Sequence, residues 1–89
     1  MTSSTDIREI TFNTIARNVA EILPNIEAND ISITGKLIDY GCNSIDRADV
    51  VWKTLEDLNL DIPITEFSNV QDINGLTELF CFHLGKQQC

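Results

Sequence analysis

The sequence predicts an all-α fold, a small bundle of three main helices and one short helix with a long loop after the first helix. Three segments carry apolar residues at helical spacing, and residues typical of helix ends flank them. The 89 residues, 43% of them hydrophobic, suffice for one modest core and are too apolar for a disordered chain. We therefore expect residues 1–89 to form a single domain.

The first helix is predicted to run from Thr5 to Leu23. Ser3, Ser4 or Thr5 can cap its start. Pro24 marks its end, because the residue before a proline disfavours helical backbone. The apolar stripe expected to face the core consists of Ile7, Ile10, Ile15, Val19, Ile22 and Leu23, with Phe12 and Ala16 beside it.

The connection from Asn25 to Asn43 is long, and it contains residue pairs that are typical of turns, such as Thr34-Gly35 and Tyr40-Gly41. A loop of this length without structure of its own needs anchors in a compact domain. Aliphatic side chains are expected to pin it to the helical core at Ile26, Ile31, Ile33, Leu37 and Ile38.

The second helix is predicted from Ser44 to about Asn59, with Asn43 as its N-cap and Asp46 completing the capping pair. Winding the segment at 3.6 residues per turn separates its side chains by face. The arc expected to face the core holds Ala48, Val51, Leu55 and Leu58. The arc expected to face water holds Asp46, Asp49, Lys53, Glu56 and Asp57, with Ile45 and Trp52 at the boundary.

After Pro63, a short helix of about one turn is predicted over Ile64 to Ser68. Ser68 is then the expected N-cap of a last helix, with Gln71 as its capping-box partner. Gly85 fits the stop of that helix. The apolar stripe of the last helix is expected to contain Val70, Ile73, Leu76, Phe80 and Leu84, with Leu79 alongside.

The composition excludes several classes of function. Fourteen acidic residues against six basic ones give a net charge of −8, which argues against nucleic acid as a partner and favours enzymes with basic docking surfaces. No apolar run reaches the length of a membrane span, and the polar N-terminus is no secretory signal. Three cysteines without metal-ligand spacing indicate a reduced, cytoplasmic protein, which we expect to be a monomer.

Ser44 stands where the predicted second helix begins, and a helix N-terminus favours an attached phosphate. The run Leu37, Asp39, Gly41, Asn43, Ser44, Ile45 and Asp46 resembles the attachment site of acyl carrier proteins, roughly L-x-D-x-G-x-[DN]-S-[LI]-D. This resemblance implies a small acyl-carrier-type bundle. It also implies a 4'-phosphopantetheine arm, taken from coenzyme A and joined to Ser44 by a phosphodiester.

Two departures from the fatty-acid carriers indicate which kind of acyl carrier the sequence resembles. Asn43 replaces the usual aspartate before the serine, and Arg47 and Lys53 place positive charge on a helix that is usually acidic. The run G-C-N-S-I-D-R and the shortened third segment are similar to free-standing donor carriers of polyketide β-branching cassettes. The similarity implies a carrier that holds an acetyl group, made from malonyl, as a thioester.

The same resemblance implies the partners. They are a phosphopantetheinyl transferase, an acyltransferase, a decarboxylating ketosynthase-like enzyme and an HMG-CoA synthase-like enzyme that receives the acetyl group. The residues expected to bind partners are Ile45, Asp46, Asp49, Trp52, Lys53 and Glu56. An ordinary amphipathic helix with solvated charges explains the same pattern, and Trp52 is equally a candidate for the rim of the core.

The chain is not expected to be an enzyme. His83 is the only histidine and lies far from Ser44 in the sequence, so a base for a serine nucleophile is not indicated. Cys42 is expected to be a small packed side chain, and Cys81 to lie on or near the core face. Two alternatives remain open: an aminoacyl or peptidyl carrier of nonribosomal synthesis, and a helical interaction module that never carries the arm.

Overall fold

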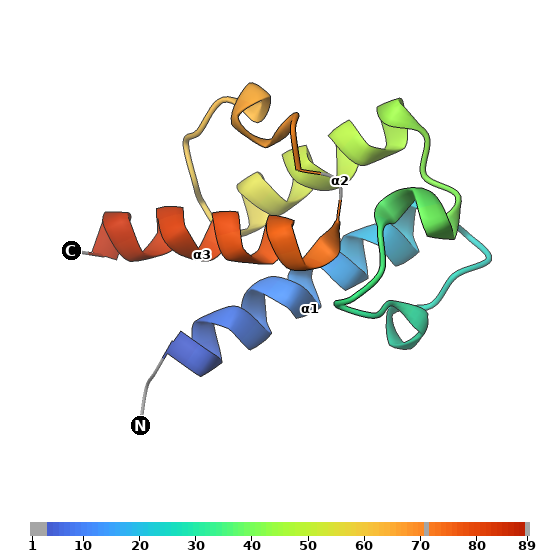
Figure 1. Ribbon diagram of the computed structural model, residues 1–89, viewed down its shortest axis with the longest axis horizontal. Coiled ribbons are helices and arrows are strands. Elements are labelled where there is room, and N and C mark those ends of the chain that lie inside the picture. Colours follow the sequence, from blue (N-terminus) through green and yellow to red (C-terminus); the bar gives the residue numbers. More distant parts are fainter. Residues whose placement is uncertain (1–3, 71, 89) are drawn as a thin grey trace.

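The computed structural model describes residues 4–70 and 72–88, and over these residues the fold is all-α, as predicted. The α-helices are α1 (Ser4–Ile22), α2 (Ser44–Asp57) and α3 (Ile73–Gln88) (Figure 1). Three 3-10 helices lie between them: η1 (Ala28–Asp30), η2 (Leu37–Tyr40) and η3 (Ile64–Phe67). No helix in the described part of the chain is long and apolar enough to cross a membrane.

The core lies where α1 meets the other two α-helices. α1 packs against both α2 and α3, and η3 packs against α2 (Figure 1). The fully buried apolar side chains come from all three helices and from the first loop: Ile15, Val19, Leu37, Val50, Ile73, Leu76 and Phe80. Phe67 of η3 stacks on Phe80 with ring centroids 4.5 Å apart. The predicted stripes of the first and last helices are therefore confirmed in most of their positions.

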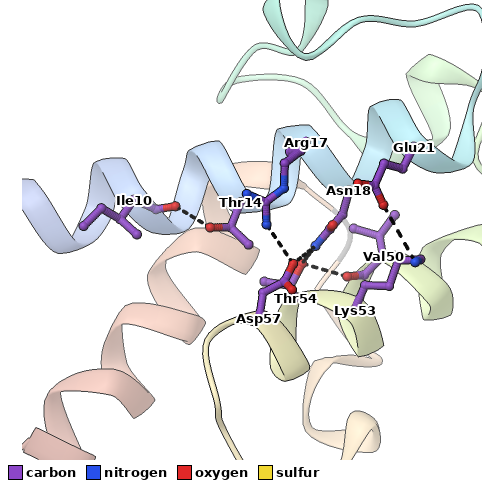
Figure 2. Close-up of polar contacts among 9 residues, drawn as sticks. All are labelled: Ile10, Thr14, Arg17, Asn18, Glu21, Val50, Lys53, Thr54 and Asp57. Carbon is purple, nitrogen blue, oxygen red and sulfur yellow. Dashed lines mark hydrogen bonds and ion pairs between the residues drawn. The ribbon is translucent and has the colours of Figure 1, made fainter.

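Polar side chains join α1 to α2 at the edge of this core, and the apolar pattern did not predict these contacts. Asn18 is buried and donates hydrogen bonds to Thr54 Oγ1 at 3.0 Å and to Asp57 Oδ2 at 3.1 Å. Arg17 forms an ion pair with the same carboxylate at 3.0 Å (Figure 2). The register of the two helices is thus set by directional contacts as well as by apolar packing.

The predicted rotation of the second helix was wrong in part. Val51 and Leu55 are buried as expected and Leu58 is half-buried, but Ala48 is exposed while Val50 and Thr54 are fully buried. Thr54 tolerates burial because its hydroxyl donates to the Val50 carbonyl at 2.7 Å and accepts from Asn18. Ile45 and Trp52 consequently point outward rather than lying at the boundary.

The α2 helix ends at Asp57, two residues earlier than predicted. Asn59 takes a left-handed φ of 58°, a conformation that ends a helix. The Leu60 N–H then bonds back to the Leu55 carbonyl at 2.9 Å, in the manner of a Schellman motif.

The long first loop is anchored less uniformly than predicted. Ile31 and Leu37 are buried and Ile26 and Ile33 are half-buried, but Ile38 is 69% exposed. The loop is also tied through its backbone, because the Ile73 N–H donates to the Gly35 carbonyl at 3.0 Å. Next to this hydrogen bond, Lys36 and Asp72 form an isolated antiparallel β-bridge. In α1, Ile10 is likewise exposed instead of facing the core.

Both predicted ends of the last helix were wrong. Ser68 ends η3, with its N–H bonded to the Thr65 carbonyl, and Gln71 lies outside the described residues. Asp72 caps α3 instead, accepting a hydrogen bond from the Gly75 N–H at 2.9 Å. Gly85 lies inside α3, which continues to Gln88.

The predicted short helix is η3, a single turn of 3-10 helix over Ile64–Phe67. Across the described residues the fold is therefore a bundle of three α-helices with short 3-10 turns, rather than four α-helices.

Candidate functional site

The segment before α2 turns sharply to bring Ser44 to the start of the helix. Gly41 has a φ of 102°, which other residues adopt only with strain. Its N–H closes η2 on the carbonyls of Leu37 and Ile38, and the Cys42 N–H bonds to the Leu37 carbonyl at 3.2 Å. Buried Leu37 anchors this turn in the core. Ser44 is thus the first residue of α2 and is exposed.

The predicted cap of α2 is confirmed. The Asp46 N–H donates to Asn43 Oδ1 at 2.8 Å, and the Asn43 N–H donates to the Asp46 carboxylate at 3.3 Å. The N–H groups of Ser44 and Ile45 have no acceptor within the described part of the chain. These free donors and the positive end of the helix dipole surround the Ser44 hydroxyl, so a phosphate is favoured there.

Two surface hollows meet at Ser44. Both are lined by Ser44 and Arg47. The first hollow is completed on the side of the first loop by Ile38, Cys42 and Asn43. The second lies between α2 and η3 and is completed by Ala48, Val51, Ile64, Thr65, Phe67 and Ser68. An extended group attached to Ser44 would have surface to lie along on either side of α2.

A family model described as "Phosphopantetheine attachment site" matches residues 13–80, which include all of α2 and both hollows. The polyketide biosynthesis acyl-carrier protein AcpK of Bacillus subtilis (strain 168) is 35% identical over 68 residues, covering 76% of this chain and 83% of that protein. The chain belongs to the acyl carrier protein family. No solved structure matches it.

Family membership identifies the prosthetic group as 4'-phosphopantetheine and the protein as a carrier, not a catalyst. The surroundings of Ser44 fit this group, because an exposed hydroxyl, unpaired N–H groups and open surface coincide there. When bound, the arm supplies a thiol that holds acyl groups as thioesters.

The residues predicted to bind partners divide into two groups. Ile45, Asp49, Trp52 and Glu56 are spaced by four, three and four residues and are all exposed, so they share one face of α2 opposite the core. We call these four residues the outer face of α2. Ile45 is 71% exposed and Trp52 is 55% exposed, so Trp52 is not a core residue.

The other two predicted residues have partners within the chain. The Asp46 carboxylate serves the cap of α2. Lys53 is half-buried and faces Glu21 of α1, with Nζ 3.8 Å from the carboxylate. The structure therefore brings four of the six predicted residues together on an exposed surface and assigns structural contacts to the other two.

Cys42 is a packed residue, as predicted. Its side chain is 4% exposed, and burial, together with the nearby Asp46 carboxylate, raises the pKa of the thiol. A neutral buried thiol is a poor nucleophile. Cys81 is half-buried next to Thr11, which agrees with its predicted place near the core. Both are free cysteines.

Two residues near Ser44 were not predicted to belong to the site. Ile38 was assigned to the core and instead lines the first hollow. Arg47 was noted only as a departure from the family pattern, yet it lines both hollows. Its spacing of three residues from Ser44, about one helical turn, was the signal that could have identified it.

Proposed function

We propose that this protein is an acyl carrier of polyketide biosynthesis and that its phosphopantetheine arm is attached to Ser44. The observation that carries the proposal is the exposed Ser44 hydroxyl at the capped start of α2, inside the segment matched by the family model. The name of the Bacillus subtilis relative supports polyketide biosynthesis as the setting. The free thiols of Cys42 and Cys81 support a reducing, cytoplasmic location.

The test is the intact mass of the protein after incubation with coenzyme A and a phosphopantetheinyl transferase of broad specificity. The wild-type chain should gain the mass of one phosphopantetheine. Ser44→Ala should gain none while remaining folded. The matched control is Ser68→Ala, because Ser68 is an exposed serine that lines the second hollow opposite Ser44 and should not affect loading.

Each other outcome has a clear meaning. Loading that persists in Ser44→Ala would reject the assigned serine. A folded wild-type chain that gains no mass would favour a helical interaction module that does not carry the arm.

Within polyketide biosynthesis, we propose that the carrier donates an acetyl group for β-branching. Support comes from the residues around Ser44, where Cys42, Asn43 and Arg47 match the pattern of donor carriers in β-branching cassettes. An acyltransferase would load malonyl, a decarboxylating ketosynthase-like enzyme would convert it to acetyl, and an HMG-CoA synthase-like enzyme would consume it. The loaded protein should lose its acetyl group to such a synthase when the acceptor carrier is present. Loading by an amino-acid-adenylating enzyme instead would indicate a carrier of nonribosomal synthesis.

We further propose that partner enzymes bind the outer face of α2. Its two carboxylates, Asp49 and Glu56, complement the basic docking surfaces that a net charge of −8 favours, and Ile45 and Trp52 add apolar contact area. Contacts of this size suit a carrier that must leave each enzyme in turn.

The experiment is charge reversal on the outer face. Asp49→Lys with Glu56→Lys should slow transfer of the arm or acyl group to partners, and the defect should shrink as salt screens the charges. The control is Glu9→Lys with Asp61→Lys, which reverses two exposed carboxylates outside α2. Equal rates in the two double variants would contradict an electrostatic role for the outer face.

A further inference from the structure

Arg47 carries a charge that the fold does not use. Three other basic residues form ion pairs in the described part of the chain: Arg8 with Glu78, Arg17 with Asp57 and Lys53 with Glu21. Arg47 has no ion pair and no side-chain hydrogen bond to any described residue, although it is half-buried. The Asp46 carboxylate beside it is engaged in the cap of α2.

The position of Arg47 is unfavourable for the helix itself. It is the fourth residue of α2, where the helix dipole presents its positive end, and a cation there is repelled rather than stabilised. The charge of an unpaired guanidinium in the first turn therefore does not stabilise α2. Its presence is explained if an anion arrives at this end of the helix.

Arg47 and Ser44 are the two residues that line both hollows. They are three residues apart in α2 and so lie on neighbouring turns of the same side of the helix. Any group bonded to the Ser44 oxygen begins where the two hollows meet, and Arg47 lines both of them. The free N–H groups of Ser44 and Ile45 lie at the same end.

We propose that Arg47 is a positioning residue whose guanidinium binds the phosphodiester that joins the phosphopantetheine arm to the protein. This inference rests on the proposed attachment at Ser44. A phosphodiester carries one negative charge on two non-bridging oxygens, and the planar guanidinium presents a fork of donors that matches this geometry. The contact holds the first atoms of the arm close to α2, so that the thiol end sweeps a smaller volume.

The experiment compares apo and holo forms of the wild type, Arg47→Gln and Lys53→Gln. Lys53 is the matched control, because its removal takes one positive charge from the same helix at a residue that already has a partner in Glu21. The readouts are the phosphorus-31 NMR shift of the phosphodiester and the difference in melting temperature between the holo and apo forms.

The wild type and Lys53→Gln should share one phosphorus resonance. In Arg47→Gln that resonance should move toward its position in the urea-unfolded holo protein. The gain in melting temperature on modification should fall by about 2–4 °C in Arg47→Gln, the size expected for one exposed charge pair in a small domain. Arg47→Lys should give an intermediate resonance, because lysine keeps the charge without the fork.

A second measurement uses the unaltered holo protein. Raising NaCl from about 0.02 M to about 1 M should move the wild-type resonance toward that of Arg47→Gln, because salt screens the exposed pair.

An identical resonance in Arg47→Gln and the wild type, with one arm on each by mass, would overturn the role of Arg47 and leave the attachment at Ser44 intact. Absence of the arm from the folded wild type would overturn the attachment and this inference together. A transfer defect in Arg47→Gln with an unchanged resonance would show that Arg47 binds a partner protein instead.

Discussion

Asn18 shows how one buried polar side chain can decide the orientation of a helix. Its amide group donates to Thr54 and Asp57 of α2, and Thr54 in turn donates to the carbonyl of Val50 (Figure 2). The network fixes which side of α2 faces α1. The outer face, on the opposite side of the helix, is a consequence of that choice.

Replacing Asn18 by alanine should therefore lower stability. We expect Asn18→Ala to cost about 1–3 kcal/mol, because Thr54 Oγ1 loses its donor in a buried position. Urea unfolding followed by circular dichroism measures this difference. Asn13→Ala, at an exposed position of the same helix, should change the free energy of unfolding by less than about 0.5 kcal/mol. Equal losses in the two variants would show that the network does not stabilise the fold.

Cys42 should make stability depend on pH in the alkaline range. Burial and Asp46 raise the pKa of its thiol above the ordinary value of 9.0, so the folded state keeps a proton that the unfolded state loses. The free energy of unfolding should therefore fall as the pH rises above 9.0, with a slope of at most about 1.4 kcal/mol per pH unit. Urea midpoints at about pH 8 and about pH 10 should differ more in the wild type than in Cys42→Ala. A fall of the same size in both proteins would assign the effect to other groups.

At the scale of elements, the two glycines of α3 should respond in opposite directions to alanine. A Cβ at Gly75 would lie 2.8 Å from Val70 Cγ1 and 2.9 Å from the Asp72 carboxylate that caps α3, whereas a Cβ at Gly85 would meet nothing within 4 Å. Gly75→Ala should destabilise the protein by about 1–2 kcal/mol through crowding. Gly85→Ala should stabilise it by up to about 1 kcal/mol through helix propensity. Thermal unfolding of the two variants measures both changes in stability. A stabilising Gly75→Ala would mean that Val70 and the Asp72 carboxylate move aside at little cost.

The start of α3 explains why helix ends were harder to predict than helix interiors. Ser68 and Asp72 are both good capping residues, and local sequence does not choose between them. The choice depends on the hydrogen bond from the Ile73 N–H to the Gly35 carbonyl, a contact between segments far apart in the chain. By contrast, the cap of α2 involves only Asn43 and Asp46, which are close in sequence, and it was predicted correctly.

The candidate site was likewise predictable only where it depends on residues that are close in sequence. Ser44 and its cap follow from local pattern, and the family motif lies within one short segment. The exposure of Ile38 and the outward position of Trp52 were not predictable, because they depend on how η2 and α2 rotate against the core. The rotation of α2 is set in part by the contact between Asn18 and Thr54, whose polarity made them poor candidates for burial in an apolar pattern.

At the scale of the whole molecule, the net charge of −8 opposes folding through repulsion among the carboxylates. The described ion pairs are largely exposed and offset little of it. The melting temperature should therefore rise by a few degrees when salt is added to a dilute buffer. Differential scanning calorimetry at two salt concentrations measures the change. The double variant Glu9→Lys, Asp61→Lys, which has a smaller net charge, should show a smaller rise, and a fall with salt would mean that the ion pairs dominate.

The direction in which α2 runs has a practical consequence. The first turn of α1 and the last turn of α3 lie toward one end of the 37 Å long axis, and α2 begins toward the other (Figure 1). A dye, a bead or a neighbouring domain joined at either end would stand clear of Ser44. The protein can therefore be immobilised by its ends with Ser44 turned toward an enzyme in solution.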